Sequence, residues 1–258
     1  MKDSFCVFSP VVDKEVLCGD SLSELFVESF SGEKLEDNDI VCITHKVVSK
    51  SEGQVVRLSS VSVSDIARHY AEIVKKDPRL IEVILSQSAD VVSAVPNGPF
   101  IVRTKDGIVC ANGAVDCSNS STEDEVILLP QNIDASAARI RRELEAIYGV
   151  SLAVIICDSH GRAFRKGCCG VALGASGIEP LKSYIGKPDR RGRTMQSSKE
   201  CIADELAGVA NLVMGQGNES RPFVIVRGFN YCKKGGNASV IIRPREQDLF
   251  LSKFGGLK

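Results

Sequence analysis

One uninterrupted apolar run does more than any other segment to constrain the fold. Residues 151–158 read SLAVIICD, and only the two ends of this run are polar. A short apolar run of this kind is typical of a buried β-strand. The preceding residues 134–148 start at Asp134, a suitable N-cap, have apolar side chains at helical spacing and end before Gly149, where a helix C-terminal cap belongs. The sequence therefore predicts a helix followed by a buried strand, with Asp158 at the carboxyl end of that strand.

Other helices and strands are mixed along the chain. The patterns predict strands at 40–43 and 222–228, with a polar turn and a second short strand after residue 43. They predict helices that begin at Ser64 and at Asp77, and a third helix over 199–214. They also predict a hairpin over 99–116. Because several strand pairs are adjacent hairpins rather than βαβ units, we expect an α+β fold rather than a doubly wound sheet. A chain of 258 residues without a clear linker is compatible with one large domain or two small lobes.

The charge balance argues against several classes of function. The 32 basic and 33 acidic residues give a formal net charge of −1. Without an overall positive field, we expect no binding to nucleic acid or to an anionic membrane, and any anion site must be local. The chain has no apolar stretch of about 18 residues, and its start, MKDSFCVFSP, lacks the apolar segment of a signal peptide. We therefore expect a cytoplasmic protein without membrane spans.

The ten cysteines are expected to be reduced thiols. Cys42, Cys110 and Cys157 lie inside runs rich in Val and Ile, where cysteine usually acts as a small buried apolar residue. Cys168 and Cys169 are adjacent, and no CxxC pair or Cys/His spacing typical of zinc sites is present. A disulfide framework or a zinc site is therefore not expected.

The segment ICDSHGRAFRKG, residues 156–167, places an acid, a hydroxyl and an imidazole at consecutive positions, Asp158, Ser159 and His160. Neighbouring strand residues point to opposite faces, and no G-x-S-x-G elbow surrounds Ser159, so a hydrolase triad is disfavoured. Carboxylate and hydroxyl oxygens suit Mg²⁺ or Mn²⁺, and Asp116, after another predicted strand, is a candidate second carboxylate. Alternatively, both acids cap loops by accepting from backbone N–H groups. The residues alone favour the capping interpretation.

Cations beside glycines indicate a second kind of chemistry. Lys50 precedes Gly53, and Arg162, Arg165 and Lys166 precede Gly167, an arrangement that suits phosphate because backbone N–H groups approach closely at glycine. Surface lysine beside a turn glycine is more often simply solvated. The chain contains no G-x-x-x-x-G-K-[ST], and residues 215–220, GQGNES, do not complete G-x-G-x-x-G. A nucleotide would therefore bind outside the P-loop and Rossmann designs.

Seven blocks, taken together, resemble a known family. In order they are KVVSKSEG, NGAVDCSN, ICDSHGRAFRKG, VALGASGI, IGKPDRRGR, ECIADELAGVANLVMGQG and VIVRG. This order over residues 10–228 resembles the coenzyme F-420 γ-glutamyl ligase family, the CofE-like proteins. The resemblance is specific, because an accidental match would require seven separate blocks to coincide in the same order.

The resemblance implies an α+β, CofE-like fold of two mixed α/β lobes that is neither P-loop nor Rossmann. Residues 1–258 would form one ligase unit of two interleaved lobes, active as a homodimer. Its implied cofactors are Mg²⁺ or Mn²⁺, with a monovalent cation as a further candidate, and its implied partners are GTP, L-glutamate and a carboxylate-bearing acceptor. In that family the acceptor carboxylate of a deazaflavin precursor is phosphorylated by GTP and then attacked by the amine of L-glutamate.

The resemblance also implies roles for individual residues. Metal would be bound by Asp116, Asp158, Ser159 and Gln216. The nucleotide would be bound by Lys50, Asn119, Met214, Gly215, Gln216, Gly217, Asn218 and Glu219. Lys50 would contact its phosphates, and Arg162 and Arg165 are the candidates for clamping phosphate or a carboxylate substrate. These assignments raise the metal interpretation of the two aspartates above the capping one.

This chain departs from the expected family pattern at three positions. Ser159 stands where a threonine is usual, which keeps the hydroxyl, and His160 stands where many members have asparagine. Gln216 stands where we expect a metal-binding glutamate, so one negative charge is missing. A folate γ-glutamyl ligase on the same scaffold is the alternative, and a nucleotide-binding homologue that has lost catalysis is a second. The basic residues 187–193 either attract an anionic substrate or form a solvated turn.

Overall fold

The predicted buried strand is part of a five-stranded mixed sheet. The computed structural model describes residues 4–30, 32–233 and 235–248. The strand order in this sheet is β1-β12-β2-β8-β9, in which β2 and β8 are parallel and the other neighbours antiparallel. The bounds are β1 Cys6–Phe8, β2 Ile40–Thr44, β8 Ala153–Arg162, β9 Arg165–Ser176 and β12 Phe223–Arg227.

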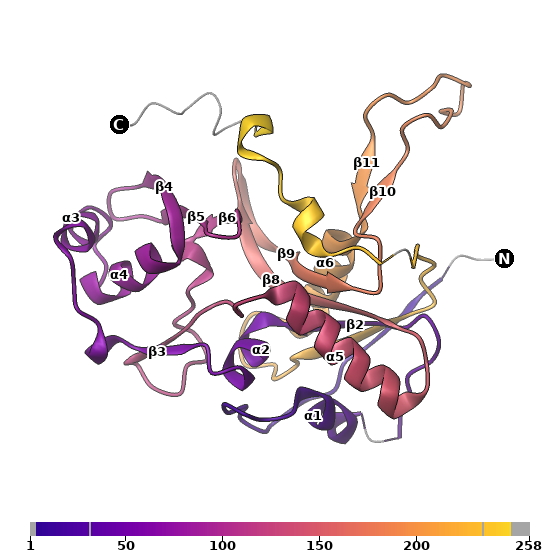
Figure 1. Cartoon of the computed structure of the whole chain (residues 1–258), viewed down its shortest axis with the longest axis horizontal. Coiled ribbons are helices and arrows are strands. Elements are labelled where there is room, and N and C mark those ends of the chain that lie inside the picture. Colours follow the sequence, from indigo (N-terminus) through magenta and orange to yellow (C-terminus); the bar gives the residue numbers. More distant parts are fainter. Residues whose placement is uncertain (1–3, 31, 234, 249–258) are drawn as a thin grey trace.

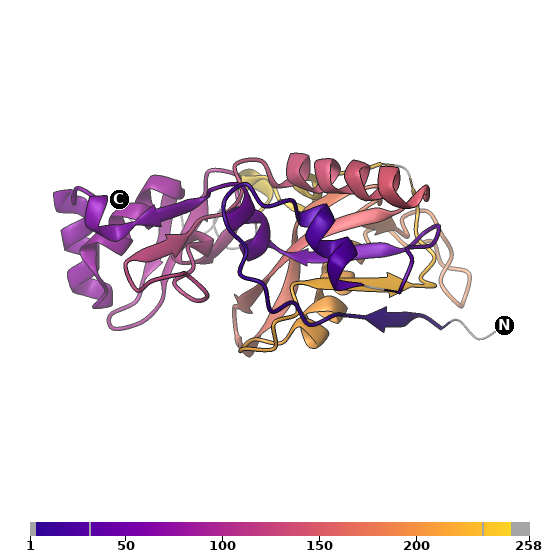
Figure 2. The same ribbon diagram turned by 90° about the horizontal axis from the view of Figure 1, so that it is seen from below.

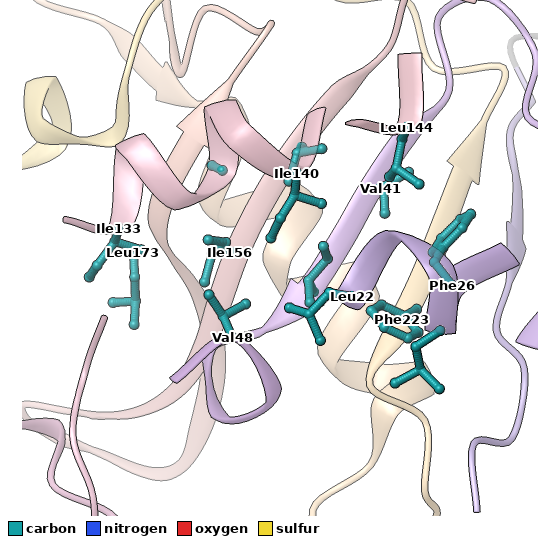
Figure 3. Close-up of a cluster of buried hydrophobic side chains, with 14 of the residues drawn as sticks. Leu22, Phe26, Val41, Val48, Ile133, Ile140, Leu144, Ile156, Leu173 and Phe223 are labelled. Carbon is teal, nitrogen blue, oxygen red and sulfur yellow. The ribbon is translucent and has the colours of Figure 1, made fainter. Parts of the chain in front are cut away.

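Helices cover both faces of this sheet, as Figure 2 shows. On one face lie α1 (Leu22–Ser29) and α5 (Ile133–Tyr148), and on the other lies α6 (Ile202–Met214). Alternate residues of each strand point to opposite faces, so Val41 of β2 packs beneath α1 and α5, while its neighbour Cys42 packs against α6. Figure 3 shows the first of these cores, with Leu22, Phe26, Ile140 and Leu144 of the helices facing Val41, Ile156 and Phe223 of the strands.

A smaller lobe is formed between Val55 and Leu128 and has its own core (Figure 1). The chain enters it through β3 and leaves it through β7, which pair antiparallel. Its elements are β3 Val55–Arg57, α3 Asp65–Val74, α4 Pro78–Gln87, β4 Ser88–Ala94, β5 Phe100–Thr104, β6 Val109–Ala111 and β7 Glu125–Ile127, with short 3₁₀ turns at Leu58–Ser60 and Asn112–Ala114.

The remaining elements extend from the main sheet. Helix α2 (His45–Ser51) follows β2 directly, and β10 (Leu181–Ser183) pairs with β11 (Lys199–Cys201) at the base of a long loop that projects from the molecule in Figure 1. The basic residues 187–193 lie in this exposed loop. The C-terminal segment contains 3₁₀ turns at Ala238–Ile241 and Arg245–Gln247.

The α+β prediction is confirmed, and so are several local signals. Ser64 and Asp77 cap α3 and α4 by accepting from the amides of Ala67 and Arg79. The hairpin of β5 and β6 turns at Gly107, with φ of 91°. Gly149 caps α5 in the left-handed region, as expected for a helix C-terminus.

Four local predictions are wrong in detail. Residues 45–51 form helix α2 rather than a polar turn, because several of its polar side chains are buried against the protein. Strand β8 does not end at Asp158 but continues to Arg162, because β9 pairs with it along the whole length. The N-cap of α5 is Asn132, since Asp134 instead accepts from the amides of Ala175 and Ala238. Helix α6 starts at 202 because residues 199–201 pair with β10.

None of the ten cysteines forms a disulfide, which confirms the prediction of free thiols. Cys42, Cys110 and Cys157 are buried, as expected from their apolar surroundings. Among the described residues, no helix is sufficiently long and apolar to span a bilayer.

Candidate functional site

The parallel pairing of β2 and β8 determines where the candidate residues meet. Parallel strands end at the same edge of a sheet, and Thr44, the last residue of β2, is the register partner of Cys157. Helix α2 therefore begins beside Asp158, although His45 and Asp158 are distant in sequence. The buried part of β8 ends at Cys157, so Asp158 is the first residue of this strand outside the core.

A cavity of about 300 Å³ opens at this edge. Its walls are formed by α2, by β8, by residues near the N-terminus and by the connection from α6 to β12. Nine of the site residues predicted from the sequence line this cavity: Lys50, Asn119, Asp158, Ser159, Met214, Gly215, Gln216, Gly217 and Asn218. Asp116, Glu219, Arg162 and Arg165 are not part of its lining. The polar lining residues that sequence analysis missed are Lys14, Glu15, Thr44, Lys46, Asn211, Ser220 and Arg221.

Two lysines of α2 face this cavity. Lys46 and Lys50 are four residues apart, which places them on the same side of a helix. The Lys50 side chain is only 10% exposed, and its Nζ donates to Oε1 of Glu15 at 2.5 Å. The Lys46 Nζ lies 2.9 Å from Oδ2 of Asp116 and donates to Oγ of Ser118 at 2.7 Å. A helical assignment for residues 45–51 would have pointed to Lys46.

Asp158 lies between two histidines. Nε2 of His45 is 3.6 Å from Asp158 Oδ1, and Nε2 of His160 is 3.4 Å from Oδ2. Burial alone would raise the pKa of Asp158, but the two imidazoles and the backbone amide of Ser159 outweigh burial and lower this pKa to about 2. Asp158 is therefore ionised at neutral pH. His45 is fully buried, and burial lowers its pKa despite the nearby carboxylate.

Asp116 and Asp158 both line a further cavity of about 290 Å³. Ser159 and His160 also line this cavity. The backbone of Asp116 forms an isolated bridge to Ile127. Burial raises the pKa of Asp116, but hydrogen bonds from Ser118 and Lys46 outweigh burial and lower it overall. Asp116 accepts from the amide of Ser118 at 2.6 Å, so it makes the loop-capping contact as well as facing the cavity.

The loop after α6 is organised around Gln216. Its Nε2 donates to Asn211 Oδ1 at 2.8 Å and to the Gly215 carbonyl at 3.0 Å, while its Oε1 accepts from Ser159 Oγ at 2.9 Å. Glu219 accepts from the amide of Gly217 at 2.7 Å, and hydrogen bonds from its own amide and from that of Gly217 lower the pKa of Glu219. Glu219 therefore shapes the loop from outside the cavity.

Arg162 and Arg165 lie at the far end of the β8–β9 hairpin, where they are register partners. Both are exposed, and Arg162 donates to the carbonyl of Lys166 at 3.1 Å. Neither lines the two cavities that contain Asp158. The binding of phosphate or a carboxylate substrate by Arg162 and Arg165 stays a prediction, and their position outside both cavities does not support it.

Comparison with known proteins connects this geometry to a family. The sequence model described as F420-0:Gamma-glutamyl ligase matches residues 12–228. The chain belongs to this family. It is 39% identical over 237 residues to the coenzyme F420:L-glutamate ligase of Methanothermobacter thermautotrophicus, covering 90% of this chain and 93% of that protein.

Two further relatives share that name. The chain is 41% identical over 230 residues to the coenzyme F420:L-glutamate ligase of Methanocaldococcus jannaschii, covering 89% of this chain and 90% of the relative. It is 44% identical over 224 residues to that of Methanococcus maripaludis strain C6, covering 86% and 89%. Every residue that lines the 300 Å³ cavity falls within the matched range of the F420-0:gamma-glutamyl ligase family.

The donor atoms at the site are compatible with a divalent cation. Two ionised carboxylates, the hydroxyl of Ser159 and the amide oxygen of Gln216 are hard ligands of the kind that Mg²⁺ and Mn²⁺ prefer. The buried Nε2 atoms of His45 and His160 make no hydrogen bond to any described residue. Within the described ranges, no three His, Cys, Asp or Glu side chains are arranged to hold a metal. A cation here would therefore need the Ser159 and Gln216 oxygens, or oxygens of a bound substrate, to complete its coordination.

Proposed function

We propose that this protein joins L-glutamate to the carboxylate of a coenzyme F-420 precursor, using GTP and a divalent cation. The observation that supports this most is the meeting of Asp158, Ser159, Gln216 and two lysines of α2 at the wall of one cavity. Phosphoryl transfer requires mainly positioning and neutralisation of charge, and this arrangement supplies both. Family membership and the names of the relatives support the glutamate-ligating activity.

The reaction has two bond-forming steps. An oxygen of the acceptor carboxylate attacks the γ-phosphorus of GTP, and the bond from that phosphorus to GDP breaks, which gives an acyl phosphate. The amine of L-glutamate then attacks the acyl carbon, phosphate leaves, and the nitrogen loses a proton as the amide forms. A bound divalent cation would neutralise phosphate charge during the first step.

The residues of this chain have distinct parts in that scheme. Asp158 and Asp116 would hold the cation, with Ser159 and Gln216 as neutral oxygen ligands. The ammonium groups of Lys46 and Lys50 would contact phosphate oxygens, exchanging their present partners Asp116 and Glu15. Residues 214–218 and Asn119, which line the same cavity, would contact the nucleotide.

Product analysis tests this function. The protein is incubated with GTP, L-glutamate, Mn²⁺ and either the deazaflavin precursor or a folate, and the products are weighed by mass spectrometry. We expect the deazaflavin product to gain glutamate residues and GDP to appear in equal amount. Extension of the folate alone would replace the deazaflavin acceptor, and extension of neither would refute the ligase.

A matched pair of variants tests the site. Asp158→Asn keeps the size of the side chain but removes the charge, so we expect product formation to fall by at least about 100-fold. Asp65→Asn makes the same change on the exposed first turn of α3 and should leave the rate unaltered. Mn²⁺-dependent GTP binding that is equal in both variants would contradict the assignment of Asp158.

A further inference from the structure

Two histidines from different elements flank the carboxylate of Asp158. Strand β2 ends beside Cys157 of β8, and His45 follows β2 directly, so its side chain lies next to Asp158. His160 comes two residues after Asp158 in the same strand, which places these two side chains on the same face. Two distant parts of the sequence therefore each bring an imidazole to one carboxylate.

Each imidazole faces a different oxygen of Asp158. Nε2 of His45 lies 3.6 Å from Oδ1, and Nε2 of His160 lies 3.4 Å from Oδ2. Both nitrogen atoms are buried, and neither has a hydrogen-bond partner among the described residues. Buried polar atoms without a partner are uncommon, because their lost hydration is not replaced. Two of them around a single carboxylate indicate a role beyond packing.

His45 is placed to act on the site through Asp158. Its side chain is 0% exposed, and it lines neither of the two cavities that Asp158 lines. Direct contact of this imidazole with a substrate is therefore disfavoured. Because no three His, Cys, Asp or Glu side chains in the described ranges are arranged to hold a metal, the two histidines do not join Asp158 as ligands of one cation.

A buried serine on α2 orients the His45 imidazole. Oγ of Ser49, one helical turn after His45, lies 3.4 Å from Nδ1 of the ring. The hydrogen bond made by one ring nitrogen of histidine decides whether the other carries the proton. A hydroxyl that donates to Nδ1 leaves the proton on Nε2, which faces Asp158. Ser49, His45 and Asp158 thus form a chain of contacts from the interior to the cavity wall.

We propose that His45 and His160 are positioning residues that fix the carboxylate of Asp158 for a divalent cation. This inference rests on the proposed function, which assigns a cation to Asp158. With an imidazole at each oxygen, rotation of the carboxylate is restricted, so less conformational freedom is lost when the cation binds. Carboxylates that bind metals are commonly held by such outer contacts, and removing one costs about 10–100-fold in metal affinity or activity.

Direct measurement of Mn²⁺ binding to the full-length protein tests this role. Mn²⁺ is titrated with and without a non-hydrolysable GTP analogue, and free Mn²⁺ is measured by electron paramagnetic resonance. His45→Leu and His160→Leu should each raise the Kd for Mn²⁺ by about tenfold or more. His45→Gln and His160→Gln keep an N–H donor and should retain most of the affinity. Ser49→Ala leaves the imidazole in place and should raise the Kd several-fold.

His69, the third histidine of the chain, supplies the matched control. It is exposed on α3, so His69→Leu should leave the Kd for Mn²⁺ unchanged. Urea unfolding without Mn²⁺ detects a purely structural role. A changed free energy of unfolding with an unchanged Kd would overturn the proposal, as would equal losses of affinity in the Leu and Gln variants.

Two further outcomes have a defined meaning. If His45→Leu does not fold, Ser49→Ala and His160→Leu decide, and an unchanged Kd in both would overturn the proposal. Wild-type protein that binds no Mn²⁺ under either condition would instead refute the cation site of the proposed function. Failure of the positioning role and failure of the proposed function are therefore distinguishable.

Discussion

At the scale of single residues, Gln216 links several parts of the site. Its amide nitrogen donates to Asn211 and to the Gly215 carbonyl, and its oxygen accepts from Ser159. Gln216→Glu would add a negative charge beside Asp158, and cation affinity increases with the charge of the ligands. We therefore expect the half-saturating Mn²⁺ concentration, measured from product formation, to fall several-fold.

The same substitution has a structural cost. A carboxylate cannot donate to Asn211 or Gly215, and a typical hydrogen bond contributes about 0.5–1.5 kcal/mol. The free energy of unfolding should therefore decrease by about 1 kcal/mol in Gln216→Glu. Gln216→Ala separates the two effects, because it loses the same donor without adding charge. If both variants respond equally to Mn²⁺, Gln216 is not a metal ligand.

The cysteines divide into two reactivity classes. Burial raises the pKa of Cys42 and that of Cys110 to about 12, so almost no reactive thiolate exists at pH 8. Cys18 and Cys232 are exposed. We expect iodoacetamide to label the exposed pair in the native protein and the buried pair only after unfolding, as read by peptide mass spectrometry. Equal labelling of Cys42 and Cys18 under native conditions would show that the main sheet opens.

At the scale of elements, residues 167–177 contain four glycines and lie largely in strand β9. Its glycines allow helices to pack closely on both faces. A Cβ added at Gly170 would lie 2.2 Å from the Ala207 carbonyl oxygen of α6, and one at Gly174 would lie 2.5 Å from Ile133 of α5. We expect Gly170→Ala and Gly174→Ala each to reduce the free energy of unfolding by about 1–3 kcal/mol, measured in urea.

Two other glycines are controls for that prediction. Gly161, near the end of β8, and Gly208, within α6, have no heavy atom within 4 Å of an added Cβ. Gly161→Ala should be nearly neutral. Gly208→Ala should stabilise the protein by up to about 1 kcal/mol, because alanine favours helix. Destabilisation by all four substitutions would show that β9 is not specially packed.

The success of prediction at this scale depended on how local each signal was. The caps at Ser64 and Asp77 and the turn at Gly107 depend on neighbouring residues only, so the sequence predicted them. Helix α2 depends on the burial of polar side chains against other segments. Because Lys46, Ser49 and Lys50 are polar, the local pattern predicted an exposed turn instead. Lys46 and His45 therefore went unrecognised, although both contact a predicted aspartate.

At the scale of the whole molecule, long-range pairing decides which residues share a site. The family resemblance named nine of the residues that line the 300 Å³ cavity in advance, because their blocks are distinctive. It said nothing of the C-terminal segment, which lies beyond residue 228 yet lines a cavity of about 460 Å³ together with the β5–β6 hairpin. No local pattern shows that residues 241–245 return to the β5–β6 hairpin, where Gly107 lies against Ile242.

Asp90 is the ionic connection between the smaller lobe and that C-terminal segment. Its Oδ2 accepts from Arg103 of β5 and from Arg245. The hydrogen bond from Arg103 is the largest cause of a lowered pKa of Asp90. Asp90→Ala should therefore reduce the free energy of unfolding at pH 7 by about 1–2 kcal/mol, because it leaves the partly buried Arg103 without its partner. It should also speed trypsin cleavage after Arg245.

The pH dependence of this effect follows from the sign of the pKa shift. A carboxylate whose pKa is lower in the folded than in the unfolded protein contributes fully above its unfolded pKa of about 3.9. The contribution is lost as the pH falls through the folded value, so wild type and Asp90→Ala should converge below about pH 4. Glu72→Ala, an exposed acid on α3, should show no difference at either pH. A stability gap for Asp90→Ala that persists undiminished at pH 2.5 would mean that packing, rather than the Asp90 charge, holds the C-terminal segment against the smaller lobe.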